Sequence, residues 1–224
     1  MAAYEIEIKS LLGGKNNADN LITKMKADDP NFQSLGPHKQ QNHYFSGSNT
    51  VLLYSNIVKH VEKEKKENLK NLCEQAKDYS IRTANRDGRV LLIIKASIDD
   101  TTSSNGTARI ELESEVDLSL EELDKLILDS GFHYQAKWSR ERQEFKYKDM
   151  NVSIDKNAGY GYLAEFEKII SDPDKAENTK TFIRDCMNVL GLQELPQDRL
   201  ERMFAYYNQN WQDYYGTEKT FNID

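Results

Sequence analysis

Charged residues of both signs recur at alternate positions in several short stretches of this chain. They stand at Glu5, Glu7 and Lys9, at Arg109, Glu111 and Glu113, at Arg140 and Arg142, and at Glu165 and Glu167, with mostly apolar residues between them in three of the four stretches. Alternate side chains of a β-strand point to the same face, so each stretch would gather its charges on one face. Arginine and lysine bind phosphate oxygens, and clustered carboxylates supply the oxygen ligands that Mg²⁺ or Mn²⁺ takes. The pattern indicates a metal-assisted polyanion site.

A charged strand face has a simpler interpretation, since such faces are usually exposed to water. An exposed face gains little from ion pairs, however, and several such strands in one chain favour a sheet that turns its charges inward. Arg82 and Lys95 would add cations from two further strands. The apolar faces would then point outward, where amphipathic helices could cover them.

The elements that must position these residues follow from hydrophobic periodicity. Alternation with period two predicts eight strands, at about residues 3–11, 41–45, 79–85, 90–97, 108–118, 137–148, 152–155 and 162–170. Helical spacing predicts helices at about 17–26, 58–77, 119–130, 174–190 and 198–212. We expect an α+β fold, an eight-stranded antiparallel β-barrel with flanking helices. One domain would span 1–224, with a solvated helical insertion at about 58–77 and a C-terminal helical extension at about 198–215.

Composition limits the classes of function. The chain has 224 residues, 38% of them hydrophobic and 30% charged, which suits a folded domain rather than a disordered chain. A formal net charge of −7 argues against a nucleic-acid partner held by bulk electrostatics. No apolar run is long enough for a membrane span, and two isolated cysteines suggest neither a disulfide framework nor a zinc site. We expect a cytoplasmic protein with no membrane partner.

The order of the motifs resembles that of the CYTH superfamily, the triphosphate tunnel metalloenzymes. Glu5 to Lys9 matches the Glu-x-Glu-x-Lys signature of its first strand. The later strands follow the family in turn, with Gln41 and Tyr44-Phe45, Ile81-Arg82, Ile94-Lys95, Arg109-x-Glu111-x-Glu113, Arg140-x-Arg142, Asp155 and Glu165-Phe166-Glu167. The resemblance covers roughly residues 4–192. Class IV adenylate cyclases, thiamine triphosphatases and inorganic triphosphatases belong to this superfamily.

The resemblance implies a role for each matched residue. It assigns Mg²⁺ or Mn²⁺ to Glu5, Glu7, Glu165 and Glu167, with Glu111, Glu113 and Asp155 as catalytic acids that add ligands or position water. It assigns the triphosphate of a small-molecule substrate to Lys9, Arg82, Lys95, Arg109, Arg140 and Arg142. One position departs from the family, because Ser80 stands where the third strand usually carries a first arginine. Arg86 or Arg89 could compensate from the following turn.

Three functions remain open at this point. Hydrolysis of a triphosphate is favoured because water needs no binding pocket, whereas a class IV adenylate cyclase, which makes cyclic AMP and pyrophosphate from ATP, must also hold a purine. A silent nucleotide- or polyphosphate-binding module is the third, although six acids would hinder an anion binder that lacks a metal.

Two other groups of residues are interpreted as structural. The four histidines show no paired spacing, and we expect them to be structural or surface residues. The aromatic residues near the C-terminus, such as Tyr207 and Trp211, are expected to pack against the sheet. A purine-stacking lid and a homodimer contact are the alternatives.

Overall fold

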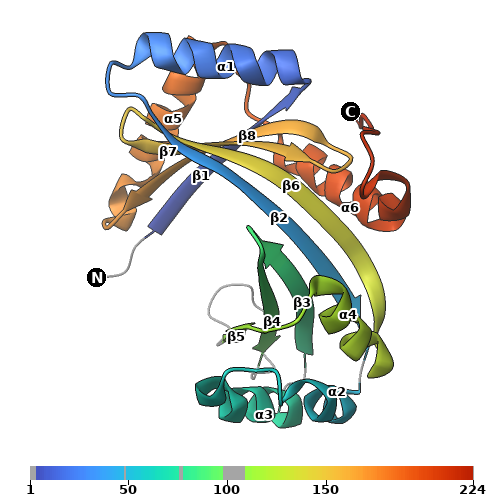
Figure 1. Ribbon diagram of the computed structural model, residues 1–224. Helices are drawn as coiled ribbons and strands as arrows, with labels where there is room; N and C mark the ends of the chain where they lie inside the picture. The colour runs from blue at the N-terminus through green and yellow to red at the C-terminus, as the bar shows by residue number, and fades with distance from the viewer. Residues whose placement is uncertain (1–3, 48, 76–77, 98–108, 224) are drawn as a thin grey trace. The chain divides into compact units, whose positions relative to one another are not determined.

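The computed structural model describes residues 4–47, 49–75, 78–97 and 109–223, and in these ranges eight strands form one antiparallel sheet (Figure 1). The strands are β1 (Tyr4–Gly13), β2 (Gln33–Ser46), β3 (Asp78–Arg86), β4 (Arg89–Ser97), β5 (Arg109–Glu115), β6 (His133–Tyr147), β7 (Met150–Asn157) and β8 (Gly161–Ile170). Their order is β1-β8-β7-β6-β2-β3-β4-β5. The described hydrogen bonds do not close the sheet, because β1 and β5 stand at the two ends of this order.

Six α-helices lie in the described ranges: α1 (Lys15–Asp28), α2 (Thr50–Ile57), α3 (Lys66–Gln75), α4 (Leu120–Asp129), α5 (Ala176–Leu190) and α6 (Gln197–Tyr214). Short 3-10 turns precede α3 and α5, at Lys63–Lys65 and Pro173–Lys175. None of the helices in these ranges is both long and apolar enough to cross a membrane.

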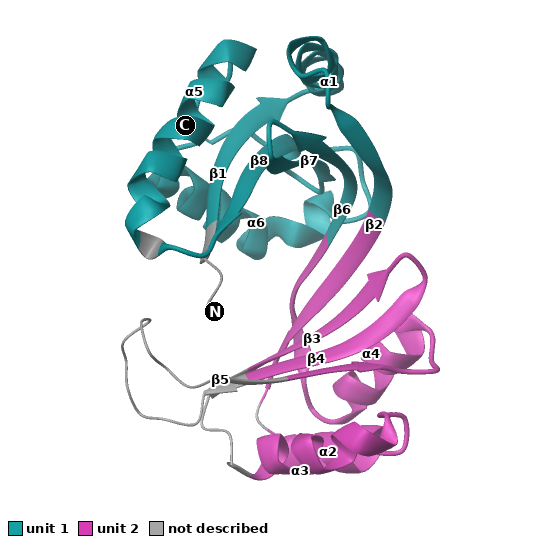
Figure 2. Cartoon of the chain, turned by 90° about the vertical axis from the view of Figure 1, so that its left-hand side faces the viewer, with its two compact units in different colours: residues 1–38, 139–224 teal, residues 39–138 magenta. Residues whose placement is uncertain are grey.

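The chain divides into two compact units, coloured separately in Figure 2. Unit 1 comprises residues 1–38 and 139–224, and unit 2 comprises residues 39–138. The chain passes from one unit to the other within β2 and within β6. Each unit has its own apolar core.

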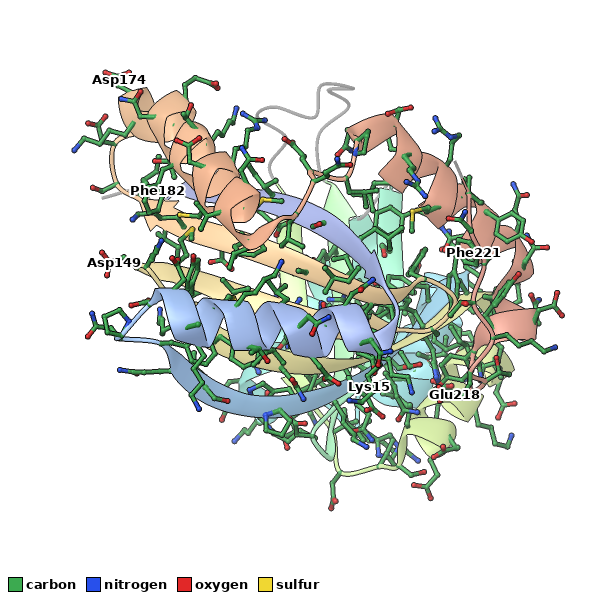
Figure 3. The ribbon with its side chains drawn as sticks, turned by 90° about the horizontal axis from the view of Figure 1, so that it is seen from above. Lys15, Asp149, Asp174, Phe182, Glu218 and Phe221 are labelled. Carbon is green, nitrogen blue, oxygen red and sulfur yellow. The ribbon has the colours of Figure 1, made fainter. Side chains whose placement is uncertain are left out.

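In unit 1, one face of the strands is apolar and is covered by α1 and α5, which Figure 3 shows from above. Ile8, Val152 and Phe166 belong to this face and are almost completely buried. Met25 of α1 and Ile183 of α5 belong to the same core and have no exposed surface. Because side chains alternate along a strand, this arrangement leaves the charged residues of the same strands on the opposite face.

In unit 2, helix α4 begins as its sequence predicts. Ser119 caps the helix by accepting a hydrogen bond from the backbone N–H of Glu122, whose side chain accepts one from Ser119 in return. This capping box fixes the start of the helix. Helix α4 then buries Leu123, Asp124 and Ile127.

Asp124 is a buried carboxylate with three hydrogen-bonding partners. His43 Nδ1 lies 2.6 Å from its Oδ2, and the hydroxyls of Thr83 and Tyr134 donate to it over 2.6 and 2.8 Å. Burial raises the pKa of Asp124, but these partners outweigh burial and hold the pKa below its usual value. His43 is therefore part of a structural network that ties α4 to β2 and β3.

The eight strands and most helices confirm the sequence prediction, while two elements differ. β2 begins at Gln33 rather than Gln41, since the strand continues through Gly36 and Pro37. The helix expected at 58–77 is confirmed only in its second half, since α3 begins at Lys66 after the 3-10 turn at Lys63–Lys65. Val61, Leu69 and Leu72 of this segment are core residues of unit 2. The polar loop expected near 99–107 lies outside the described residues.

The C-terminal aromatic residues pack within unit 1, which confirms the structural interpretation for several of them. Tyr207 of α6 is 1% exposed, and its ring lies 5.3 Å from that of Tyr160, at the turn between β7 and β8. The ring of Phe221, in the segment after α6 (Figure 3), also lies 5.3 Å from Tyr160. Gly159 must be glycine, because its φ is +79° and a Cβ would meet both Tyr207 and Phe221 within 3 Å.

Replacing Asp124 with asparagine should destabilise the protein by about 2 to 3 kcal/mol, because the amide cannot accept all three hydrogen bonds and leaves His43 without an anionic partner. Urea unfolding at pH 7 measures this change. Asp129→Asn, at an exposed position of the same helix, is the control and should leave the urea midpoint unchanged. Equal stability of D124N and wild type would contradict the network's role.

The difference in unfolding free energy between wild type and D124N should depend on pH. The folded-state pKa of Asp124 is depressed, so its stabilising contribution is present above the unfolded value of about 3.9. That contribution is lost as the pH falls from there through the folded-state pKa. The difference in unfolding free energy between wild type and D124N should therefore narrow below about pH 4, and a constant difference down to pH 2 would contradict this assignment.

Candidate functional site

The predicted site residues of unit 1 lie on one face of four neighbouring strands. In the antiparallel register, Glu7 and Lys9 of β1 stand opposite Glu167 and Glu165 of β8. Ser153 of β7 stands opposite Glu165 on its other side. Arg142 of β6 stands opposite Asp155 of β7. Carboxylates and cations from distant parts of the sequence are thereby brought side by side, as the alternation predicted.

Asp155 and two arginines form the most buried part of this face. Arg142 donates from Nε and Nη2 to the two oxygens of Asp155, each over 2.7 Å, in a bidentate pair. Arg140 donates from Nη1 to the same carboxylate over 3.1 Å. The side chain of Asp155 is only 2% exposed, whereas those of Arg140 and Arg142 are 19% and 15% exposed.

The ion pairs continue from Arg142 to the first strand. Arg142 Nη2 also donates to Glu165 Oε2 over 2.6 Å, and Lys9 Nζ lies 3.4 Å from Glu165 Oε1. Lys9 in turn pairs with Glu7 on its own strand. Three cations and three carboxylates thus form one connected row from β6 to β1.

The environment shifts the pKa of several of these groups. Burial raises the pKa of Glu165, but the charges of Lys9, Arg142 and Arg140 outweigh burial and bring it below its usual value. Burial likewise opposes the charge of Arg142, yet Asp155 and Glu165 raise its pKa above the usual value. For Arg140 burial dominates and lowers the pKa. Glu165 is therefore held as an anion and Arg142 as a cation.

A cavity of about 130 Å³ opens beside this row. Its polar lining consists of Glu144, Glu165 and Glu167 with Arg142, Asn151 and Ser153. Ser153 is 7% exposed and donates a hydrogen bond to Glu165 over 3.3 Å. The volume suits several water molecules or a hydrated cation.

Asn151 and Ser153 also line the cavity, although neither was predicted as a site residue. The sequence does carry a signal for them. β7 alternates polar and apolar residues as β1 and β8 do, and Asn151 and Ser153 stand at the alternate positions that lead to Asp155. His38 was set aside on sequence grounds, but its Nε2 lies 3.4 Å from Glu144 Oε2, and Glu144 lines the cavity.

The side chains of three of the four predicted metal ligands are described. Glu7, Glu165 and Glu167 share the face, and Glu5 stands on β1 opposite Ile169, although its side chain lies outside the described set. Among the described side chains, no group of three or more His, Cys, Asp or Glu residues is close enough to hold a metal ion. The metal set therefore stays a prediction.

The remaining predicted residues belong to unit 2. Arg82 of β3 stands opposite Tyr44 of β2, donates to its hydroxyl over 3.3 Å, and has its guanidinium carbon 5.7 Å from the ring centroid. Lys95 of β4 is exposed and stands opposite Glu111 of β5. The backbones of Arg109 and Glu111 are described in β5, but their side chains are not.

The arginines that could replace the missing third-strand arginine are engaged elsewhere in unit 2. Arg86 donates to Glu113 over 3.0 Å, and Arg89 donates twice to Glu115. Ser80 lies near the other end of β3, opposite Lys95. Neither arginine therefore takes the place of a cation at Ser80.

Comparison with solved structures shows the fold. The PH1012 protein from Pyrococcus horikoshii matches with a TM-score of 0.50 and 19% identity, over 85% of this chain and 92% of its own. A conserved hypothetical protein from Pyrococcus furiosus matches with a TM-score of 0.50 and 18% identity, over the same shares. A "putative adenylate cyclase" from Vibrio parahaemolyticus matches with a TM-score of 0.51 and 11% identity, over 92% of this chain and 99% of its own.

No family model matches the sequence, and no curated protein matches it. The likeness to the solved structures is therefore one of fold.

Replacing Arg142 with methionine should cost about 3 kcal/mol of stability, since it leaves Asp155 buried without its bidentate partner and removes a cation from Glu165. Denaturant unfolding measures the loss. Arg89→Met is the matched control, because it breaks an arginine–glutamate pair at an exposed position and should leave the midpoint unchanged. An R142M protein as stable as R89M would show that the row contributes nothing to folding.

Proposed function

We propose that this chain hydrolyses a triphosphate-containing small molecule with the help of Mg²⁺ or Mn²⁺. The observation that supports the proposal is the connected row on one face of unit 1, in which Lys9, Arg140 and Arg142 alternate with carboxylates. A solvated face would gain little from such pairs, whereas here the arginines are mostly buried. Cations held in this way suit a polyanionic substrate.

The strands set the spacing of the cations. Lys9 of β1 and Arg142 of β6 both contact the carboxylate of Glu165, so these two cations are close enough to contact different parts of one extended polyphosphate. Arginine offers a planar fork to two phosphate oxygens, and lysine offers a point charge. In this proposal Arg140, Arg142 and Lys9 bind the phosphate chain and hold it in line for attack.

The carboxylates suit a hard divalent cation. Glu7 and Glu167 stand directly opposite each other, and side chains in such cross-strand pairs have Cβ atoms about 5 Å apart, which one cation can bridge. Glu5 stands two residues before Glu7 on the same strand, and the family resemblance assigns it to the same metal. Glu165 is already bound by Arg142 and Lys9 and would have to release a partner to join. When bound, the metal would neutralise phosphate charge and lower the pKa of a coordinated water.

The chain's own residues account for the rest of the reaction. In phosphoryl transfer, negative charge is spread over the non-bridging and leaving oxygens, and fixed positive groups stabilise it. Arg142 and Lys9 are fixed by their carboxylate partners before the substrate arrives. The resemblance to the CYTH superfamily adds Arg82, Lys95 and Arg109 as further phosphate-binding residues, and Glu111 and Glu113 as catalytic acids.

Cyclisation of ATP is the second candidate function. It is supported by the shared fold with the "putative adenylate cyclase" from Vibrio parahaemolyticus. The ribose 3′-hydroxyl would replace water as the nucleophile at the α-phosphorus, with pyrophosphate as the leaving group. A third candidate, a triphosphate-binding module without turnover, would use the same cations.

The purified protein should turn over at least one of ATP, thiamine triphosphate and inorganic triphosphate when Mg²⁺ or Mn²⁺ is present, and EDTA should stop the reaction. Chromatography of the products decides among the candidates. Orthophosphate establishes the hydrolase, and cyclic AMP with pyrophosphate establishes the cyclase. If none of the three substrates is turned over with either metal, both enzyme proposals are contradicted, and the binding module is the remaining candidate.

Replacing Glu7 and Glu167 together with glutamine should lower kcat by at least 100-fold and raise the metal concentration needed for half-maximal rate, because both proposed ligands lose their charge. Titrating the rate with Mn²⁺ measures both effects. Glu141→Gln is the control, since Glu141 lies on β6 but faces away from Arg140 and Arg142. Unchanged metal dependence in the double variant would place the metal elsewhere.

A further inference from the structure

Asp155 is bound on both of its carboxylate oxygens by arginine side chains. Arg142 takes Oδ1 with Nε and Oδ2 with Nη2, and Arg140 takes Oδ2 with Nη1. A carboxylate has about four lone-pair positions, and these three donors fill most of them. At 2% exposure, the side chain has almost no contact with water. A metal ion would have to displace cationic donors to reach it.

We infer that Asp155 is the resting counter-ion of the two phosphate-binding arginines, a positioning residue that occupies them until a polyanionic substrate competes for the same N–H groups. The inference rests on the proposed function, since it takes the arginines to be the phosphate-binding groups. It gives Asp155 a role that differs from the metal-binding or water-positioning one implied by the family resemblance.

The reason lies in the burial of the arginines. A buried guanidinium without an anion destabilises the protein, so the apo state needs Asp155. When phosphate binds, its negative charge lies close to the carboxylate across the same guanidinium groups, and the two anions repel. Asp155 thereby stabilises the site when it is empty and lowers its affinity for bound phosphate. The lower affinity favours release of a phosphate product.

Two effects oppose each other when the charge of Asp155 is removed. Affinity for the polyanion rises because a repulsion disappears and because the polyanion can replace the anionic partner that both arginines have lost. Affinity falls to the extent that the arginines lose their orientation. Arg140 and Arg142 remain confined by burial on the sheet face, so the gain in charge attraction should win.

The test uses Asp155→Asn and titration calorimetry with inorganic triphosphate in EDTA, where no metal contributes. D155N should bind triphosphate at least tenfold more tightly than wild type, and Mn²⁺ titrated alone should bind both proteins equally. In turnover assays kcat and KM should both fall. Asp149→Asn is the control for net charge, because Asp149 lies exposed in the turn between β6 and β7, and it should bind as wild type does.

The outcomes separate this inference from the proposed function. Weaker or unchanged triphosphate binding by D155N, or a tenfold loss of Mn²⁺ affinity, overturns the counter-ion role while leaving the proposed function standing. A wild-type protein that binds no triphosphate, with or without metal, overturns both.

A second measurement needs no variant and covers the case in which D155N does not fold. In the wild-type protein, adding triphosphate in EDTA should shift the NMR signals of the Asp155 carboxylate carbon and of the Arg142 Nε–H that is bound to it. Signals that stay in place at saturation would show that Asp155 does not compete with phosphate, and would overturn the inference.

Discussion

A guanidinium group that is mostly withdrawn from water needs an anion beside it, and this need organises the charged face of unit 1. Arg142 satisfies it twice, with Asp155 on β7 and Glu165 on β8. Both partners come from strands that follow β6 in the chain, so the strand register decides whether the charges meet. A shift of one residue would turn each charge toward the apolar core.

The opposite face of the same strands makes the charged face possible. Ile8, Val152 and Phe166 pack against α1 and α5, and this core fixes the register on which the ion pairs depend. β7 is buried on both faces, because Val152 and Ile154 lie in the apolar core and Asp155 is buried on the charged face. A change of register would therefore be unfavourable for both faces of this strand. The apolar residues supply the free energy of burial, and their packing holds in register the strands that carry the charged residues on the other side.

The sequence was most informative where one rule decided the structure. Alternation placed Glu7, Lys9, Arg142 and Glu165 on one face, and the structure brings their side chains together. It could not show that Asp155 faces two arginines rather than a metal or a water. Alternation predicts the face of the sheet on which a side chain lies, but not the group that this side chain binds.

The fold was predictable to a similar extent. Eight antiparallel strands followed from period two, and helix α4 followed from its capping residues. The segment at 58–77 was predicted as one solvated helix from its charges, whereas its α-helix begins at Lys66 and Val61, Leu69 and Leu72 pack into the unit 2 core. Tertiary contacts of this kind are not visible in a single sequence.

In the function proposed for this chain, the charged face of unit 1 binds a triphosphate and a divalent metal together. A crystal structure of the protein with Mn²⁺ and inorganic triphosphate, with anomalous data collected at the manganese edge, tests it most directly. We expect an anomalous peak beside the carboxylates of Glu7 and Glu167, and phosphate oxygens within hydrogen-bonding distance of Lys9 and Arg142. Manganese or triphosphate bound away from this face would contradict it.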